Sequence, residues 1–217
     1  MCAPSSPSLL YSQGITWQAL RLLVGWASRI LARSTLTRTT IWIHHRRTRI
    51  PRCHGPVNVR GGSFHRLADT IPGYAPHKYD KMIYCGLRDI NDSHKETVRK
   101  AGAKVIWGKP GKHVDFAGKL TTALSKKDYS PALAHLDLDV LDESIRKFNG
   151  YESPIGLQED DLVKCMHLVP QNATPTSLTV CSFNPSLGDG DKVTTIGVKA
   201  IIAFVKSLLR IGGLVKK

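Results

Sequence analysis

From residue 79 onward, short apolar runs alternate with segments that carry helix signals, and the connections between them are short. This alternation constrains the fold more than any other feature, because strands joined by crossover helices run parallel and the helices cover both faces of the sheet. We expect strands at 81–86, 104–107, 132–138 and 176–183, and helices at 93–101, 115–125, 158–168 and 193–209. Ligands gather at the carboxyl ends of such strands. A functional site is therefore expected at that edge of the sheet.

The basic charge is concentrated before residue 69. The chain carries a net charge of +14, and residues 1–68 hold ten arginines, no lysine and no carboxylate. This composition is typical of a mitochondrial targeting segment, and residues 16–33 can form an amphipathic helix. The basic cluster at 44–49 would also attract phosphates, although no nucleic-acid-binding motif accompanies it. A third interpretation is a gene-model artefact that was not selected with the fold that follows. A short strand is possible at 40–43.

Composition excludes several other classes of protein. No run of about 18 uncharged apolar residues occurs, so the sequence predicts no membrane-spanning helix. The five cysteines are scattered and form no CxxC pair. This pattern argues against a disulfide scaffold or a zinc ribbon, and it favours buried free thiols in a reducing compartment. We expect a cytoplasmic protein, with a mitochondrial location as the alternative.

The most informative segment is the acidic end of the strand expected at 132–138. Asp137 and Asp139 are two positions apart, so on a strand their side chains point to one face. Two buried carboxylates repel each other unless a cation neutralises them, and Mn²⁺ or Mg²⁺ prefers such oxygen ligands. The alternative is a solvated turn, because aspartates are common where strands become loops. The pattern alone leaves both interpretations open.

Four segments together resemble the ureohydrolase superfamily, arginases in particular and especially the fungal arginase-like branch. The family signature xDxDxxDP is read here from His135 to Asp142, with Glu143 in place of the proline. Residues 84–89 (YCGLRD) are similar to the arginase segment I-G-L-R-D. Residues 155–162 resemble its G-G-L segment, and residues 182–185 (SFNP) stand where arginases carry E-V-N-P. Order and spacing agree across about residues 56–212.

The resemblance implies a fold, a cofactor and a reaction. The fold would be a three-layer α/β/α arrangement with a central, mostly parallel sheet, incomplete here at its N-terminal side. The cofactor would be a pair of Mn²⁺ ions whose bridging hydroxide hydrolyses a guanidino or amidine C–N bond. On this resemblance Asp137 and Asp139 are the expected metal ligands. Asp142 is expected to orient the turn.

Several positions depart from the family pattern. The G-G-D-H and D-A-H-x-D segments that supply the other ligands are missing. His44 and His45 stand where the second belongs, followed by arginines that would repel a cation. His54, in the segment CHGP, is the candidate for the family's proton-shuttling histidine; the alternative is an ordinary loop histidine. Of the substrate-binding positions, one carries Asn91 in place of an aspartate. The other carries Ser182 in place of the glutamate that pairs with the guanidinium group.

These observations predict two regions, a basic, irregular segment at 1–55 and an arginase-like α/β part at 56–217. The leading hypothesis is an arginase-like ureohydrolase that depends on Mn²⁺ and acts on a small guanidino substrate, truncated and with impaired or absent hydrolysis. The first alternative is a non-enzymatic module that pairs with itself or with an intact paralogue. The second is a basic nucleic-acid binder acting through residues 21–66, which the missing motifs disfavour.

Overall fold

The computed structural model describes residues 39–43, 70, 78–88, 92–145, 154–183 and 190–213, and for 39–43 it describes the backbone only. The strands are β1 (Thr39–Ile43), β2 (Met82–Leu87), β3 (Lys104–Trp107), β4 (Ala132–Asp137) and β5 (Pro175–Cys181). The helices are α4 (Asp92–Lys100), α5 (Phe116–Ser125), α6 (Glu159–Asn172) and α7 (Gly190–Arg210), with short 3-10 helices η2 (Tyr79–Lys81) and η3 (Leu138–Val140).

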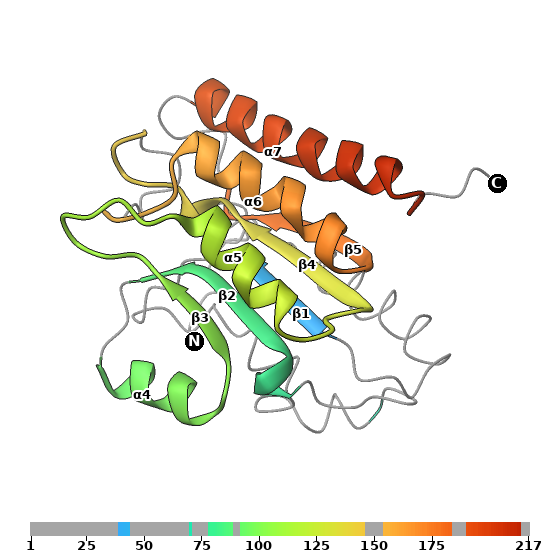
Figure 1. The fold of residues 1–217 in the computed structure, drawn as a ribbon. Coiled ribbons are helices and arrows are strands. Elements are labelled where there is room, and N and C mark those ends of the chain that lie inside the picture. The colour runs from blue at the N-terminus through green and yellow to red at the C-terminus, as the bar shows by residue number, and fades with distance from the viewer. Residues whose placement is uncertain are drawn as a thin grey trace, which may run out of the picture.

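The five strands form one parallel sheet in the order β3-β2-β1-β4-β5 (Figure 1). β1 is the central strand and pairs in parallel with both β2 and β4. Its last residue, Ile43, is in register with Cys85 of β2 and with Leu136 of β4. The carboxyl ends of these strands therefore meet at one edge of the sheet, as the sequence predicts.

Helices cover both faces of the sheet. The chain passes from β2 outward to the edge strand β3 through α4, and it returns from β3 to β4 through α5. Crossovers between parallel strands are right-handed, so these opposite directions place α4 and α5 on opposite faces. α6 packs against both α5 and α7, and Figure 1 shows these three helices side by side. The predicted three-layer α/β/α class is confirmed.

The core is divided between the two faces. Ala132, Ala134 and Leu136 of β4 are buried in the larger cluster together with residues of α5, α6 and α7. The smaller cluster on the other face is built on Met82, Tyr84 and Leu87. Because side chains alternate along a strand, the positions of β4 that do not enter the larger cluster point to the opposite face. Those positions carry the candidate site.

Most element boundaries agree with the sequence to within a few residues. The strand expected at 40–43 is present as β1. α6 continues to Asn172, past the expected end at 168, although Pro170 lacks an amide donor. Val169 and Pro170 are buried in the core, and this packing offsets the lost hydrogen bond. β5 ends at Cys181 rather than at 183, because Ser182 adopts a left-handed conformation with φ 63°.

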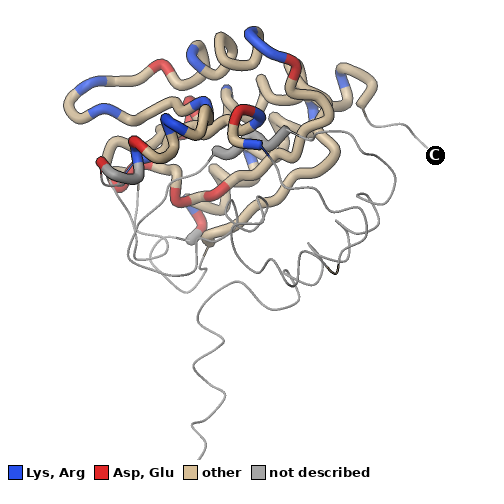
Figure 2. The backbone as a smooth tube through the Cα atoms, turned by 90° about the horizontal axis from the view of Figure 1, so that it is seen from below, with Lys and Arg blue, Asp and Glu red and all other residues tan. Residues whose placement is uncertain are grey.

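The described residues bear on the expected absence of a membrane-spanning helix and on the distribution of charge. None of the helices there is both long and apolar enough to cross a membrane. Basic and acidic positions are interspersed along the described chain, as Figure 2 shows. Most of the excess of positive charge lies before residue 69, where only residues 39–43 are described. The nucleic-acid-binding alternative therefore depends on residues that the structure mostly does not describe.

Candidate metal centre

Two neighbouring strands carry the candidate site near their carboxyl ends. β4 and β5 pair so that His135 lies opposite Thr179 and Asp137 lies opposite Cys181. All four side chains share one face of the sheet, since each pair is two residues apart on its strand. The alternate residues of β4 enter the larger core cluster. The site therefore lies on the face away from α5, α6 and α7.

His135, Asp137 and Cys181 bring three different ligand types together. His135 Nε2 lies 3.5 Å from Cys181 Sγ. One ligand atom from each of the three residues lies within 4.8 Å of the other two. No second group of three or more such side chains this close occurs among the residues that the structure describes. These three residues are thus the candidate cation site of the described chain.

The surroundings of Cys181 favour its neutral form. Burial raises the pKa of the Cys181 thiol well above its usual value, and the negative charge of Asp137 raises the pKa further. The Ser182 hydroxyl donates to the sulfur at 3.7 Å and opposes the shift. In the absence of a cation the thiol therefore keeps its proton at neutral pH. A coordinated cation reverses this preference, because coordination deprotonates a thiol.

Thr179 orients the imidazole ring of His135. The Thr179 hydroxyl lies 3.5 Å from the carbonyl oxygen of Ala134, to which it can only donate. Its oxygen also lies 2.7 Å from His135 Nδ1. When the hydroxyl hydrogen is directed at the carbonyl, this oxygen accepts the Nδ1 hydrogen, and that tautomer of His135 leaves a lone pair on Nε2. In that tautomer the nitrogen that faces Cys181 is the one able to bind a cation.

The two aspartates of the signature have different local structures. Asp137 is the last residue of β4 and is only 4% exposed, whereas Asp139 is half-buried within η3. The backbone amide of Asp139 donates to Asp137 Oδ1 at 3.0 Å, so Asp137 caps η3. The strand ends before Asp139, and the alternation that would place both carboxylates on one face does not extend to it. The group of close ligand atoms contains Asp137 but not Asp139.

Arg88 fixes the turn that follows β4. Its guanidinium group comes from the end of β2 and is 5% exposed. Nη1 donates to the carbonyl oxygen of Val140 at 3.0 Å, and Nη2 donates to those of Asp139 and Leu141 at 2.9 Å each. A planar guanidinium group can serve several carbonyls at once from fixed directions. Arg88 therefore acts on the site by positioning the backbone that carries Asp139.

Asp142 holds the far end of the same turn. Its Oδ1 accepts from the Ser144 amide and hydroxyl, and its Oδ2 accepts from the Gly156 amide at 2.8 Å. Burial alone would raise the pKa of Asp142, but these hydrogen bonds outweigh it, and the pKa lies below its usual value of 3.8. The contacts of Asp142 are those of a residue that orients the turn.

We expect Asp142→Asn to lower the free energy of unfolding by about 1 kcal/mol at pH 7. The substitution weakens the hydrogen bonds that the carboxylate accepts, and the effect is modest because the position is partly solvated. The folded-state pKa lies below the unfolded-state pKa. The stabilisation is therefore complete above about pH 4 and is lost as pH falls through the folded-state value. Urea unfolding of both proteins from pH 7 to pH 2 measures this difference. A difference that stays constant over the whole range would contradict the assignment.

The other predicted site residues are only partly covered by the structure. His44, His45, His54 and Asn91 lie outside the described residues. Ser182 is described and is half-buried directly after β5, where its hydroxyl donates to Cys181 Sγ. The structure thus brings Ser182 close to Cys181, and through it to Asp137.

His135 and Cys181 are not among the ligands predicted from the sequence. His135 stands two residues before Asp137, and this spacing on a strand was an available signal. No comparable signal was available for Cys181, because its position opposite Asp137 depends on the register between β4 and β5. That register is a property of the sheet and cannot be read from either segment alone.

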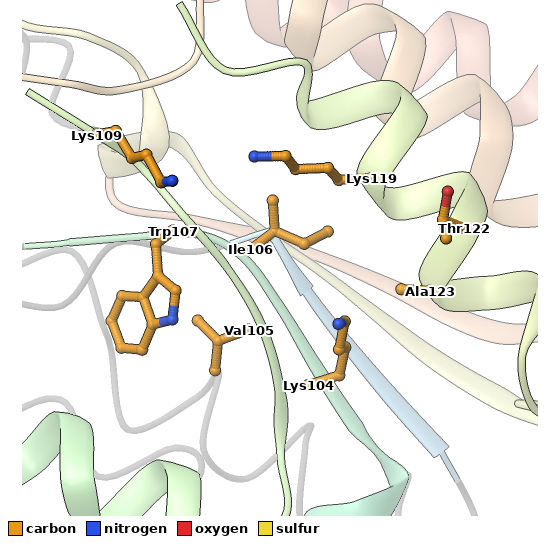
Figure 3. Close-up of a pocket in the computed structure, with 8 residues that line it drawn as sticks. All are labelled: Lys104, Val105, Ile106, Trp107, Lys109, Lys119, Thr122 and Ala123. Carbon is orange, nitrogen blue, oxygen red and sulfur yellow. The ribbon is translucent and has the colours of Figure 1, made fainter. Parts of the chain in front are cut away.

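A shallow cavity of about 300 Å³ lies elsewhere, between β3 and α5. Figure 3 shows Lys109 and Lys119 pointing toward one another across it, above Ile106. Lys104, Thr122 and Trp107 complete the polar and aromatic part of its lining, which contains no carboxylate. Cationic side chains of this kind repel metal ions. The cavity is therefore not an alternative site for a divalent cation.

The described geometry can be compared with known proteins. A family model described as the arginase family matches residues 44–206. Among solved structures, the chain is similar to the arginase of Bacillus caldovelox at 21% identity and a TM-score of 0.67, covering 84% of this chain and 64% of that one. It is similar to the Entamoeba histolytica arginase in complex with L-ornithine at 17% identity and a TM-score of 0.67, covering 84% of this chain and 65% of that one.

A Trypanosoma cruzi formiminoglutamase is also similar, at 14% identity and a TM-score of 0.58, with 85% of this chain and 60% of that one covered. No curated protein matches the sequence. At these identities the structural matches establish the fold and not the activity. The chain spans 64% of the length of the Bacillus caldovelox structure. The predicted incompleteness of the fold agrees with this partial coverage.

Proposed function

This chain belongs to the arginase family of the ureohydrolase superfamily, and we propose that it binds a divalent metal ion at the carboxyl end of β4, with weak or absent hydrolysis of guanidino or amidine C–N bonds. The observation that carries this proposal is the burial of Asp137 beside His135 and Cys181. A buried carboxylate is costly unless a cation or hydrogen bonds compensate for it. Asp139 follows in the capped turn and is the second proposed ligand.

The described donors do not fit a tight Mn²⁺ centre. Mn²⁺ is a hard ion that prefers carboxylate, carbonyl and water oxygens, and about six donors complete the sphere of such an ion. The close group offers one carboxylate, one imidazole and one thiol. When bound, a divalent metal in this family would supply an activated water for hydrolysis. We infer that Mn²⁺ binds weakly to this chain and that hydrolysis is impaired for this reason.

Substrate binding is weakened at a separate position. A carboxylate can pair with a guanidinium group through two parallel charged hydrogen bonds. Ser182 offers one neutral hydroxyl in place of the family glutamate, and in the structure this hydroxyl donates to Cys181 Sγ. A guanidino substrate would therefore lose a charged partner. The proposed substrate remains a small guanidino or amidine compound, bound less tightly than in an intact member of the family.

Calorimetric titration of the purified full chain with Mn²⁺, together with a urea-release assay on L-arginine, tests this proposal. We expect weak binding that Asp137→Asn reduces by about tenfold or more, since changes to outer-shell partners alone cost about 10–100-fold. We expect no urea release above background. Release at ordinary enzyme rates of about 1–10³ s⁻¹, lost in Asp137→Asn, would contradict the impaired activity. Binding unaffected by Asp137→Asn would contradict the site.

A second candidate function is a non-enzymatic module that docks on an intact paralogue. It is favoured by an apolar stripe on the exposed side of α7. Val198, Ile202, Val205 and Leu209 recur at helical spacing and are between 36% and 55% exposed. Contiguous exposed apolar patches mark interaction surfaces more often than scattered apolar residues do. Sedimentation velocity of the chain, alone and mixed with an intact paralogue, tests this function. A monomer unchanged by the paralogue would contradict it.

A further inference from the structure

We propose that His135, Asp137 and Cys181 form a site for a thiol-binding divalent cation, Zn²⁺ foremost, rather than for Mn²⁺. This inference rests on the proposed function only in that a divalent cation occupies the carboxyl end of β4. It changes the ligand set and the identity of the metal. His135 is not one of the aspartates of the signature that suggested Mn²⁺, and Cys181 lies outside that signature.

The distances fit a tetrahedral zinc site. Zinc lies about 2.0–2.1 Å from a histidine nitrogen and about 2.3 Å from a cysteine sulfur, so tetrahedral angles place these two atoms about 3.5–3.6 Å apart. His135 Nε2 and Cys181 Sγ are 3.5 Å apart. A carboxylate oxygen of Asp137 lies within 4.8 Å of both of these atoms. In a tetrahedral zinc site the oxygen would be about 3.4–3.6 Å from each of them. A contraction of at most about 1.4 Å in the distances to the Asp137 oxygen, which rotation of the side chains can supply, closes the site.

The backbone that holds these ligands is part of the sheet. Asp137 and Cys181 are register partners on adjacent parallel strands, and His135 is two residues before Asp137 on the same face. Neighbouring strands are about 4.8 Å apart, which sets the span across the site. Sites built on strands hold their geometry better than sites built on loops. The three ligands are therefore held near one another before any cation binds.

The outer contacts also suit a histidine ligand. Histidines that bind metals almost always donate their second ring hydrogen to another group, which fixes the ring and its tautomer. His135 Nδ1 lies 2.7 Å from Thr179 Oγ1, and the Thr179 hydroxyl is 3.5 Å from the Ala134 carbonyl oxygen. In the tautomer in which Nδ1 donates to Thr179, the metal-binding nitrogen is Nε2, which faces Cys181. The outer shell thus matches that of a metal-binding histidine.

The donor set decides between the metals. Cysteine thiolate is a soft ligand that selects zinc over the hard ions. At a given site built from nitrogen, oxygen and sulfur ligands, Zn²⁺ also binds more tightly than Mn²⁺. Three protein ligands with one open position are a recognised zinc arrangement. The same three ligands leave Mn²⁺ short of the oxygen donors it prefers. We therefore expect Zn²⁺ to bind at least about tenfold more tightly than Mn²⁺.

Cobalt substitution of the purified full chain tests the ligand set directly. Co²⁺ in a tetrahedral site with one thiolate is expected to give a near-ultraviolet charge-transfer band and intense visible bands, and Zn²⁺ should displace it. Cys181→Ala should abolish the charge-transfer band, and His135→Ala should weaken Co²⁺ binding about tenfold or more. Cys53→Ala and His167→Ala are matched controls that should keep both signals. Far-ultraviolet circular dichroism shows whether each variant is folded.

A measurement on the unaltered chain covers the case in which a variant does not fold. The rate at which iodoacetamide alkylates Cys181 can be followed by peptide mapping. Zn²⁺ should lower this rate about tenfold or more relative to the metal-free chain. Mn²⁺ at the same concentration should have little effect. Unchanged alkylation of Cys181 in saturating Zn²⁺ would overturn the inference.

The outcomes also separate this inference from the proposed function. Mn²⁺ binding that depends on Asp137, with no charge-transfer band and no effect of Cys181→Ala, would overturn the zinc site and leave the proposed function in place. A band that persists in Cys181→Ala would mean that another thiol binds the cation, and it would overturn the inference. Absence of binding by all three ions would overturn both. A metal-free hydrogen bond between His135 and Cys181 would then account for their contact.

Discussion

Arg88→Met is expected to lower the free energy of unfolding by about 3–5 kcal/mol. The guanidinium group is buried and donates to the carbonyl oxygens of Asp139, Val140 and Leu141. Methionine is similar in length but donates nothing, so these carbonyls lose a shared donor. A buried polar group left without its partner costs about 1–3 kcal/mol, and three carbonyls share the donor that is lost. The loss also frees the turn after Asp137, so metal affinity should fall with stability.

Urea unfolding followed by circular dichroism measures this effect. Arg88→Lys should recover only part of the loss, because one ammonium group cannot serve three carbonyls from a planar fork. Arg99→Met is the matched control, since Arg99 is exposed on α4 and pairs with Glu96 within the same helix. Exposed pairs of this kind contribute little to stability. Equal unfolding midpoints for Arg88→Met and Arg99→Met would show that the buried contacts of Arg88 do not hold the turn.

Gly86→Ala is expected to destabilise the chain by about 2–4 kcal/mol. Gly86 has φ 85°, a left-handed conformation that costs other residues about 1–2 kcal/mol. A methyl group there would also lie 2.5 Å from Val140 Cγ2 and 2.7 Å from Leu157 Cδ1. Overpacking of this kind costs about 1–3 kcal/mol. The close approach of β2 to η3 therefore requires glycine at this position.

Gly111→Ala separates the two contributions. Gly111 also has positive φ, at 65°, but an added methyl group would meet nothing within 4 Å. Only the backbone cost applies there, so the loss should be about 1–2 kcal/mol. The difference between the two unfolding free energies then measures the clash with Val140 and Leu157. Equal losses would mean that those two side chains move aside without cost.

The site was only partly predictable from the sequence. Asp137 and Asp139 stand out because carboxylates two apart at a strand end are unusual without a cation or a cap. The structure shows the cap, since Asp137 accepts from the Asp139 amide and the strand ends between them. Arg88 was visible in the motif YCGLRD, but the sequence does not show that its side chain crosses to η3, 51 to 53 residues further on. The roles proposed for His54 and Asn91 stay predictions, because both residues lie outside the described chain.

The sequence by itself determined the class of the fold. Apolar periodicity, caps and glycines are local signals, and they located the strands and helices from β2 to α7 and the edge at which the carboxyl ends of the strands meet. The tertiary structure alone decided the composition of the site. Whether Cys181 lies beside Asp137, and whether Thr179 orients His135, depends on the register of two strands that are about 40 residues apart. A shift of register by one residue would send these side chains to opposite faces, and no local signal specifies that choice.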